Sequence, residues 1–326
     1  MIFDRFYLQE GEGPNDRAMW FQAGLEVEWL EEWAEQKVRA DMKREGPTEA
    51  NRTIPYTDRI RQEVKKAVIQ RHDLYKPLAY IIGNQPFFSC EIECVPPLLC
   101  PRPETELWTH WVVQTVLKSA ADHDKPIRVL DMCCGTGCIG VAIAKNCPQA
   151  EVVAVDILEK AVEVSNRNAR RNGIPEARYT AKQSDMFDLF LEKESPTDGK
   201  RKVRPEYEGT FDVLVSNPPY ILPDQYVDLP ISITHWESKL ALVGDDAREH
   251  KQYTYFQELT DYGSSLLKKR VDRDVKLGIL PNIFIEIGLQ GHVVASIMER
   301  SGLFTDVLMH QDYAGQERWI SANSSH

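Results

Sequence analysis

The stretch Ile127-Arg-Val-Leu-Asp-Met-Cys-Cys-Gly-Thr-Gly-Cys-Ile-Gly-Val-Ala-Ile-Ala-Lys-Asn146 decides the fold. Its first six residues form a largely apolar run that is typical of a strand buried on both faces. A turn with two glycines follows, and the apolar residues after Cys138 continue as a helix. A strand that passes through a tight glycine turn into a helix is the opening unit of a doubly wound α/β sheet.

The same alternation continues toward the C-terminus. Further strands are predicted at 150–156, 179–183, 211–216 and 283–288, and helices at 107–117, 159–173, 249–269 and 291–300. The last two predicted strands, 304–312 and 317–323, have no helix between them and should pair antiparallel. We therefore predict a Rossmann-like α/β domain with a seven-stranded mixed sheet. A polar segment with Pro and Gly at 192–209 predicts a solvated loop.

The N-terminal part has a different pattern. Charged residues alternate with apolar ones at helical spacing from about 16 to 76, and Trp29 and Trp33 are predicted to be core residues of these helices. Alternation at 87–99 predicts a β-hairpin. We expect an N-terminal helical domain at 1–84, a hairpin linker at 85–105 and the α/β domain at 106–326.

Composition narrows the function. A net charge of −11 over 326 residues argues against broad binding to DNA or RNA. No apolar run approaches membrane-spanning length, and no targeting peptide is visible at the start. The 7 cysteines are odd in number, and Cys133, Cys134 and Cys138 crowd one loop without the paired spacing of a zinc site. We predict neither a disulfide framework nor a metal centre.

The glycine loop predicts a nucleotide-like cofactor. Gly135, Thr136 and Gly137 allow a ligand to approach the backbone, and the helix that follows offers free N–H groups. Asp156 ends the next strand, where an acid accepts hydrogen bonds from a ribose diol. Both a dinucleotide and S-adenosylmethionine fit this pattern. A plain tight turn, with Asp156 as a helix cap, would explain it without any ligand.

The motif Asn217-Pro-Pro-Tyr220 directly follows the strand 211–216. Its position and its chemistry together distinguish between these two cofactors. The carboxyl end of such a strand faces the ligand crevice. Pro218 and Pro219 donate no N–H, so nearby carbonyls stay free to accept hydrogen bonds, and Asn217 adds another acceptor. Tyr220 adds a flat surface. Such a site holds a planar NH₂ group, which a methyltransferase needs and a dehydrogenase does not.

With these motifs the chain resembles the PrmC/HemK family of protein-(glutamine-N5) methyltransferases. The segment Pro101-Arg-Pro-Glu-Thr-Glu106 before the glycine loop is more specific to that family than the Asn-Pro-Pro-Tyr motif, which other amine methyltransferases share. The segments 77–83 and 312–318 add to the resemblance, which covers nearly the whole chain. The family methylates the glutamine of the Gly-Gly-Gln motif in class I peptide chain release factors.

The resemblance implies roles for individual residues. The cofactor-binding set is Cys133, Cys134, Gly135, Thr136, Gly137, Asp156, Asp185, Met186 and Asn217, and the catalytic set is Asn217, Pro218, Pro219 and Tyr220. Asp185 and Met186 should flank the adenine, with Phe187 as an alternative to Met186. Arg102, Glu104 and Glu106 either orient a ligand or complement a helix start. Cys133 replaces the usual first glycine of the loop, and a cysteine adopts positive φ less readily.

The implied function is methyl transfer from S-adenosylmethionine to a release factor glutamine, with S-adenosylhomocysteine as product. The implied partner is a class I release factor; no direct nucleic-acid or membrane binding is expected. The loop variant is more similar to that of eukaryotic organellar members, which suggests the mitochondrial matrix, with the cytoplasm as the alternative. A nucleic-acid amine methyltransferase and a non-catalytic SAM-binding assembly factor are the rival readings.

Overall fold

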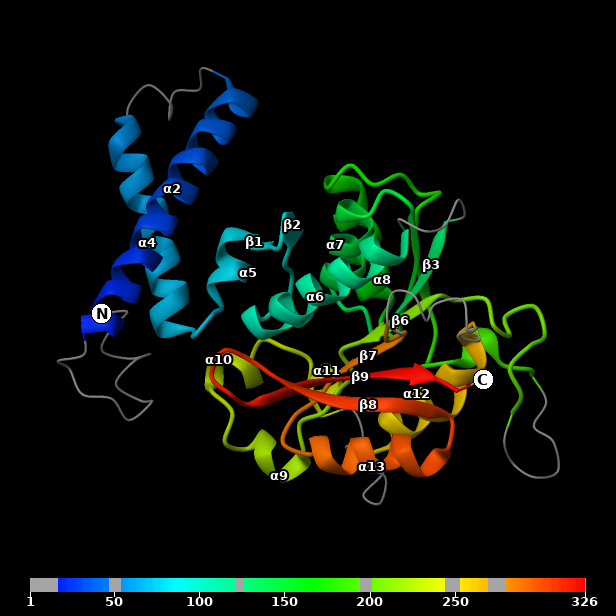
Figure 1. Ribbon diagram of the computed structural model, residues 1–326. Coiled ribbons are helices and arrows are strands. Elements are labelled where there is room, and N and C mark those ends of the chain that lie inside the picture. The colour runs from blue at the N-terminus through cyan, green and yellow to red at the C-terminus, as the bar shows by residue number, and fades with distance from the viewer. Residues whose placement is uncertain are drawn as a thin grey trace. The chain divides into compact units, whose positions relative to one another are not determined.

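A computed structural model describes residues 17–46, 54–120, 126–193, 201–243, 253–268 and 280–325 (Figure 1). Contacts divide the chain into two compact units. Unit 1 is Met1–Asn84 with Pro230–Trp236, and unit 2 is Gln85–Leu229 with Glu237–His326. The N-terminal domain predicted at 1–84 does not include Pro230–Trp236.

Unit 1 is helical. Its elements are α2 (Arg17–Glu45), α4 (Tyr56–Asp73), α5 (Leu78–Ile82) and α10 (Ile231–Thr234). Leu30 of α2 packs with Ala67 of α4 and Ile81 of α5. Arg71 of α4 donates two hydrogen bonds to the buried Glu26 carboxylate of α2, each 2.9 Å long. A bidentate pair of this kind fixes the register of the two helices.

The tryptophan prediction is wrong for Trp29, which is 43% exposed. Trp33 is partly buried against the small core of unit 1. The buried residues of α2 include Leu30, Ala34 and Val38, which recur every four residues. Small alanines allow α4 to approach this side of α2, so the helix buries that stripe and leaves Trp29 on the outside.

The segment 230–236 joins unit 1 through Trp236. Its indole Nε1 donates to the Leu74 carbonyl at 2.8 Å, and its ring lies 6.4 Å from the Tyr80 ring. The Lys76 ammonium lies 5.4 Å from the centre of the indole ring, a cation–π distance. A short segment that follows the Asn217–Tyr220 loop in sequence therefore belongs to the helical unit.

Unit 2 contains the predicted seven-stranded mixed sheet, with strand order β5-β4-β3-β6-β7-β9-β8 (Figure 1). Its strands are β3 (Ile127–Met132), β4 (Ala150–Asp156), β5 (Tyr179–Gln183), β6 (Val213–Ser216), β7 (Ile283–Glu286), β8 (Phe304–Gln311) and β9 (Glu317–Ser324). The first five strands of that order run parallel, whereas β9 runs antiparallel to both β7 and β8. The prediction of an antiparallel final pair is confirmed.

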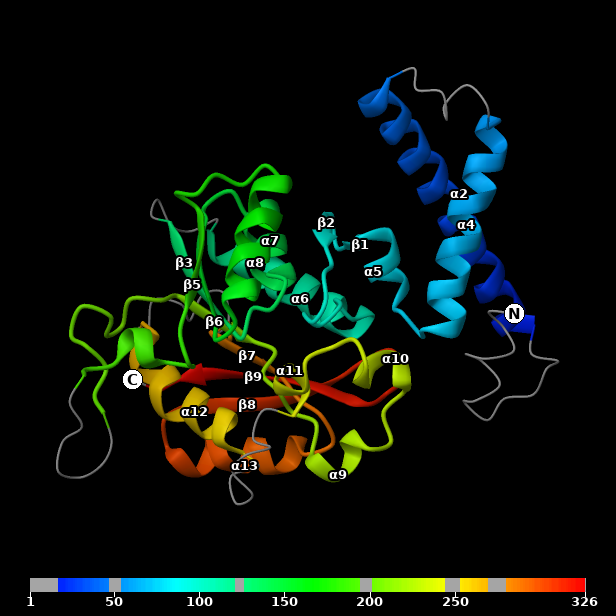
Figure 2. The same cartoon turned by 180° about the vertical axis from the view of Figure 1, so that it is seen from behind.

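Helices cover both faces of the sheet, as Figures 1 and 2 show. On one side lie α6 (Pro103–Ala120), α7 (Cys138–Asn146) and α8 (Glu159–Arg171), and on the other α12 (Thr254–Leu266) and α13 (Gly291–Ser301). The smaller elements are the strand pair β1 (Asn84–Phe87) and β2 (Cys90–Glu93), the 3-10 turn η2 (Asp188–Phe190), and the short helices α9 (Pro223–Tyr226) and α11 (Lys239–Leu242). Residues 249–252 and 269 of the predicted helix 249–269 lie outside the described residues.

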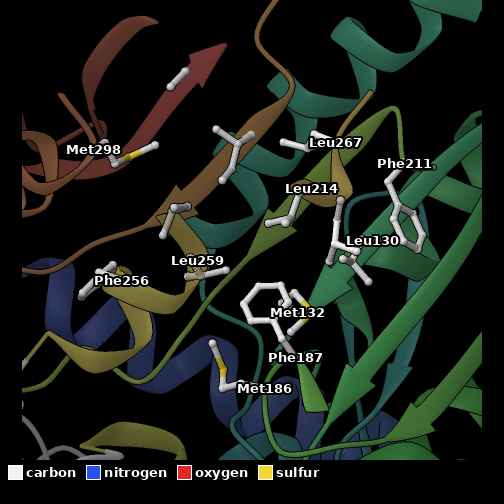
Figure 3. Packing of buried hydrophobic residues seen from close by; sticks show 14 of the residues in the cluster. Leu130, Met132, Met186, Phe187, Phe211, Leu214, Phe256, Leu259, Leu267 and Met298 are labelled. Atoms are coloured by element: carbon white, nitrogen blue, oxygen red, sulfur yellow. The ribbon is translucent and has the colours of Figure 1, made fainter. Parts of the chain in front are cut away.

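A large apolar core lies between the sheet and α12 and α13. Figure 3 shows Phe187 beside Met132, with Leu259 and Phe256 of α12 nearby. The prediction of a solvated loop at 192–209 is wrong at Val203, although most of the residues 201–209 are exposed. Val203 is buried and bridges to Leu191, and the Tyr207 ring packs edge-on against Phe190. Residues 194–200 lie outside the described residues.

Candidate active site

A pocket opens at the carboxyl ends of β3, β4 and β6, as expected for an open α/β sheet. The predicted residues that line it are Arg102, Cys133, Cys134, Gly135, Thr136, Asp156, Asp185, Met186, Asn217 and Pro219. These residues come from five separate segments of the chain. The fold therefore brings the glycine loop, the ribose-type acid and the Asn-Pro-Pro-Tyr motif to one place.

The glycine loop turns through left-handed backbone conformations. Cys133, Gly135 and Gly137 have φ angles of 58°, 53° and 78°. Cys133 adopts the conformation that a glycine would adopt more cheaply. Gly137 does not line the pocket: a Cβ there would lie 2.3 Å from the Ser165 hydroxyl oxygen and 2.7 Å from that of Tyr179. This glycine is needed for the close packing of α7.

Asp156 holds the loop to the end of β4. Its Oδ2 accepts the N–H of Gly135 at 2.8 Å, and its Oδ1 accepts the N–H of Leu158 at 2.9 Å. Burial raises the pKa of the Asp156 carboxyl, and the N–H groups of Leu158 and Gly135 offset part of that rise. Each carboxylate oxygen has a second lone pair, so both can still accept a hydrogen bond from a ligand.

Asp131 lies beneath the loop and is fully buried. Burial raises the pKa of this carboxyl to about 7, although its Oδ2 accepts the Gly140 N–H at 3.0 Å. Its Oδ1 has no hydrogen-bond partner among the described residues. Sequence reasoning placed Asp131 within the predicted strand 127–132 and gave it no role. An acid near the end of an apolar strand is the signal that identified Asp156, and it marks Asp131 as well.

The wall predicted to contact adenine contains Met186 and not Phe187. Met186 lines the pocket with φ 39°, and its sulfur lies 3.6 Å from the Cys133 sulfur. Phe187 is buried in the core, 5.6 Å from the Tyr262 ring between centroids (Figure 3). Burial raises the pKa of the Cys133 thiol far above neutral pH, so it remains a protonated, weakly nucleophilic group.

The Asn217–Tyr220 loop presents only part of its motif to the pocket. Asn217 and Pro219 line it, whereas Pro218 is buried. The Asn217 side chain makes no hydrogen bond to any described residue, which leaves its oxygen and its NH₂ group available to a ligand. The Tyr220 hydroxyl instead donates to the Glu286 carboxylate at 3.0 Å.

Arg102 reaches the pocket from just before α6. It forms an ion pair with Glu237 at 2.6 Å, and the Glu237 side chain is only 1% exposed. Burial raises the pKa of Glu237, and the Arg102 charge opposes that rise. Glu104 and Glu106 do not line the pocket; Glu106 accepts the Phe88 N–H at 3.0 Å. For Glu104 and Glu106 the geometry therefore favours the second alternative, in which they complement the start of helix α6.

Other pocket residues escaped the sequence reasoning. Apolar wall residues come from the segment before α6, from α11 and from α12: Leu98, Leu99, Leu240, Ala241 and Tyr255. No local pattern marks them, because they are ordinary apolar residues until the fold brings them together. Glu286 was also missed, although an acid at the end of an apolar strand is the same signal that identified Asp156.

Two negative observations concern only the described ranges. Within them, no group of three or more His, Cys, Asp or Glu side chains is arranged to hold a metal ion. None of the helices in the described part of the chain is long and apolar enough to cross a membrane.

The groups that line the pocket fit a cationic nucleoside ligand. A Cβ on Gly135 would meet no atom within 4 Å, so this glycine borders open pocket space. Asp156 offers carboxylate oxygens to a diol, and Met186 offers an apolar, polarisable wall to a planar base. Asp156 and Asp185 place carboxyl groups in the pocket lining, and negative charge there suits a sulfonium.

The comparisons agree with this geometry. A family model described as a methyltransferase domain matches residues 123–246. A release factor glutamine methyltransferase from Rhodopirellula baltica is 30% identical over 81% of this chain and 80% of its own length. A probable MRF1 mitochondrial N(5)-glutamine methyltransferase from Schizosaccharomyces pombe is 30% identical over 80% of this chain and 79% of its own. The N-terminal domain of human METTL16 in complex with SAH aligns with a TM-score of 0.43, at 15% identity over 81% of this chain and 82% of that one.

The sheet order, the flanking helices and the pocket define a class I methyltransferase with a Rossmann-like fold, and the protein is an enzyme. More specifically, the chain belongs to the release factor glutamine methyltransferase family.

Proposed function

We propose that this enzyme transfers a methyl group from S-adenosylmethionine to the side-chain amide nitrogen (N5) of the glutamine in the Gly-Gly-Gln motif of a class I peptide chain release factor. One observation carries the proposal: Asn217 and Pro219 line the same pocket as Gly135 and Asp156. An acceptor for a planar NH₂ group thus adjoins a site suited to S-adenosylmethionine. The names of the relatives support the choice of a release factor glutamine.

The cofactor-binding side is assigned to the glycine loop and its neighbours. Asp156 would hold the ribose, Asp185 and Met186 would flank the adenine, and Cys133 to Thr136 would line the rest. When bound, S-adenosylmethionine supplies a methyl group on a positively charged sulfur. We propose S-adenosylhomocysteine as the product and no requirement for a metal.

The acceptor side is assigned to Asn217–Tyr220. The Asn217 side-chain oxygen and a backbone carbonyl of the proline pair would accept the two N–H bonds of the glutamine amide. This holds the nitrogen with its lone pair directed at the methyl group, which offsets the poor nucleophilicity of an amide. The N–C bond forms as the S–C bond breaks, and one amide proton is then lost to solvent. No strong general base is required.

Mass spectrometry tests the proposal directly. The protein is incubated with S-adenosylmethionine and a purified class I release factor, and the peptide with Gly-Gly-Gln is sequenced. We expect one added methyl group on that glutamine, and none when the glutamine is replaced by alanine. An unmodified release factor alongside methylated DNA or RNA would favour the nucleic-acid alternative. Binding of S-adenosylmethionine without any methyl transfer would favour a non-catalytic role.

The N-terminal helical domain is proposed to recognise the protein substrate, and it provides the first prediction. Because the pocket lies wholly within unit 2, a chain that starts near Asn84 should still bind S-adenosylmethionine. It should methylate the intact release factor at least tenfold more slowly, because binding energy remote from the amide helps to orient it. Loss on a short Gly-Gly-Gln peptide should be smaller.

That truncation also removes the partners of Trp236, namely Leu74, Lys76 and Tyr80. Trp236→Phe in the full chain is the matched control for this effect. Equal rates of the truncated and full-length enzymes on the intact release factor would contradict the recognition role. Joint loss of solubility and cofactor binding would mean that unit 1 only stabilises unit 2.

The mitochondrial matrix is proposed as the compartment, with the cytoplasm as the alternative. The support is the name of the Schizosaccharomyces pombe relative, together with the cysteine-containing loop. Cell fractionation of the natural source, followed by immunodetection, tests this assignment.

A further inference from the structure

Glu286 is a buried carboxylate at the end of β7 that no step above uses. Its side chain is enclosed, with only 1% of the residue exposed. Its Oε2 accepts hydrogen bonds from the Thr105 hydroxyl and the Trp108 indole of α6, each at 2.7 Å. Its Oε1 accepts the Tyr220 hydroxyl at 3.0 Å. The carboxylate therefore links α6 to the Asn217–Tyr220 loop.

This arrangement is costly enough to need an explanation. Burial raises the pKa of Glu286, and the donors Thr105, Trp108 and Tyr220 offset only part of that rise. The residues around it in β7 and just after it are apolar and fully buried, among them Ile285 and Ile287. An apolar residue would avoid the desolvation cost but would leave the buried Thr105 and Trp108 donors and the partly buried Tyr220 hydroxyl without this acceptor.

Gln290 binds Tyr220 at its backbone carbonyl, whereas Glu286 binds it at the hydroxyl. Its side-chain Nε2 donates to the Tyr220 backbone carbonyl at 2.6 Å, and the residue is 5% exposed. A backbone carbonyl only accepts hydrogen bonds, so the NH₂ group must be the end that faces it.

Gly288 lies between these two residues and contacts the ring. A Cβ on Gly288 would lie 2.9 Å from the Tyr220 ring carbon Cδ2 and 2.8 Å from the Gln290 side-chain oxygen. The segment Glu286–Gln290 thus contacts Tyr220 at its hydroxyl, along its ring and at its carbonyl.

The contacts with Tyr220 hold the acceptor loop, Asn217–Tyr220, from the side that does not face the pocket. Tyr220, Glu286 and Gln290 do not line the pocket, whereas Asn217 and Pro219 do. The two prolines fix their own φ angles, so few torsions remain between Asn217 and Tyr220. When both ends of Tyr220 are held, the direction of the Asn217 side chain and of the loop carbonyls is largely determined.

We propose that Glu286, Gly288 and Gln290 form a tyrosine clamp that positions the acceptor loop for methyl transfer. They are positioning residues, because they act through Tyr220 and do not touch either substrate. The clamp should control the rate of transfer and have little effect on cofactor affinity. The proposal rests on the proposed function only in that the acceptor is an amide held by Asn217.

Two mild substitutions test the clamp. Tyr220→Phe removes only the hydroxyl, and Gln290→Met removes the NH₂ donor at similar volume. On a Gly-Gly-Gln peptide, each should lower kcat about tenfold, while the peptide KM changes less than about threefold and the S-adenosylmethionine Kd less than about twofold. Tyr207→Phe is the matched control and should leave kcat unchanged; its ring packs on Phe190 outside the pocket.

Hydrogen exchange supplies a readout that needs no acceptor. The backbone amides of Asn217, Tyr220 and Ile221 should exchange at least about tenfold faster in both variants than in the wild type and in Tyr207→Phe. A wild-type enzyme inert toward both the peptide and the intact release factor would contradict the proposed function, and the exchange measurement would still test the clamp.

Wild-type kcat in both variants, or unchanged exchange at Asn217, Tyr220 and Ile221, would overturn the clamp. Parallel losses of kcat, cofactor affinity and melting temperature would also overturn it, because they would indicate a general structural role. Glu286→Gln is the conservative variant, since its amide can still accept from Thr105 and Trp108 and donate to the Tyr220 oxygen. It should retain more activity than Glu286→Leu, and equal loss in the two would contradict the clamp.

Discussion

The glycine loop after β3 and the Asn217–Tyr220 loop after β6 line one pocket, but they are held in place differently. The first loop takes most of its shape from its own backbone, with Cys133, Gly135 and Gly137 at positive φ, and Asp156 at the end of the next strand holds it through the Gly135 N–H. The second takes its shape from Glu286 and Gln290, which lie 66 and 70 residues away from Tyr220 in sequence. The backbone of the glycine loop is thus shaped mainly by local sequence, whereas the Asn217–Tyr220 loop depends on contacts more distant in sequence.

The largest expected effect is at the acceptor loop. Asn217→Ala removes the one side-chain acceptor of this loop that lines the pocket, and kcat should fall on the order of a hundredfold or more. Cofactor affinity should be largely unchanged. Steady-state kinetics and calorimetry measure the two quantities. Asn146→Ala, at an asparagine that bonds to Ser89 outside the pocket, is the control. Normal turnover in Asn217→Ala would show that the acceptor site has been misplaced.

The next effect is at the cofactor loop. Asp156→Ala should weaken S-adenosylmethionine binding by roughly 1.5–3 kcal/mol, about tenfold to 150-fold, because it removes hydrogen bonds to a charged acceptor. Asp156→Asn should lose less, because its amide oxygen can still accept one N–H. Titration calorimetry gives the Kd of each variant. An unchanged Kd in Asp156→Ala would refute the ribose assignment.

A pH dependence should come from Asp131. Burial raises its folded-state pKa from 3.8 to about 7. A raised folded pKa means that the stabilising contribution is full below pH 3.8 and is lost as pH rises through about 7. Asp131→Asn keeps an oxygen for the Gly140 N–H and does not ionise. The melting temperature of this variant should therefore improve relative to wild type between pH 4.5 and 8.

The control for that experiment is Asp212→Asn, which changes the same chemical group where Asp212 pairs with Lys268 at 2.7 Å. It should not reproduce the relative gain at high pH. A pH-independent difference between Asp131→Asn and wild type would indicate that Asp131 is not shifted.

The smallest effect is expected at Cys133. Cys133→Gly relieves a left-handed conformation worth about 1–2 kcal/mol but adds about 0.5–1 kcal/mol of unfolded-chain entropy. Stability should therefore rise by at most about 1.5 kcal/mol. Cys134→Gly is the neighbouring control. Cys134 is buried without a positive φ, so its replacement should only destabilise. Chemical denaturation gives the free energy of unfolding of each variant. Equal destabilisation in the two would show that backbone strain at Cys133 does not distinguish the glycine loop.

The sequence by itself determined the catalytic fold closely. The strand at 127–132, the helix at 138–146 and the strand at 150–156 were predicted with the bounds that the structure has. Such elements are readable because their apolar pattern is fixed by burial on both faces of a sheet and by local turn chemistry. Asp156 and Asn217 were readable for a related reason: each directly follows or ends a strand, and strand ends meet at the ligand crevice.

Tertiary structure alone decided the rest. Which side of α2 is buried depended on the helices that pack against it, so Trp29 lies outside. Whether Met186 or Phe187 faces the pocket depended on a single left-handed residue. The links from Glu286 to Thr105, Trp108 and Tyr220 join segments between 66 and 181 residues apart. Hydrogen bonds at such separations leave no local pattern, because only the folded chain brings donor and acceptor together.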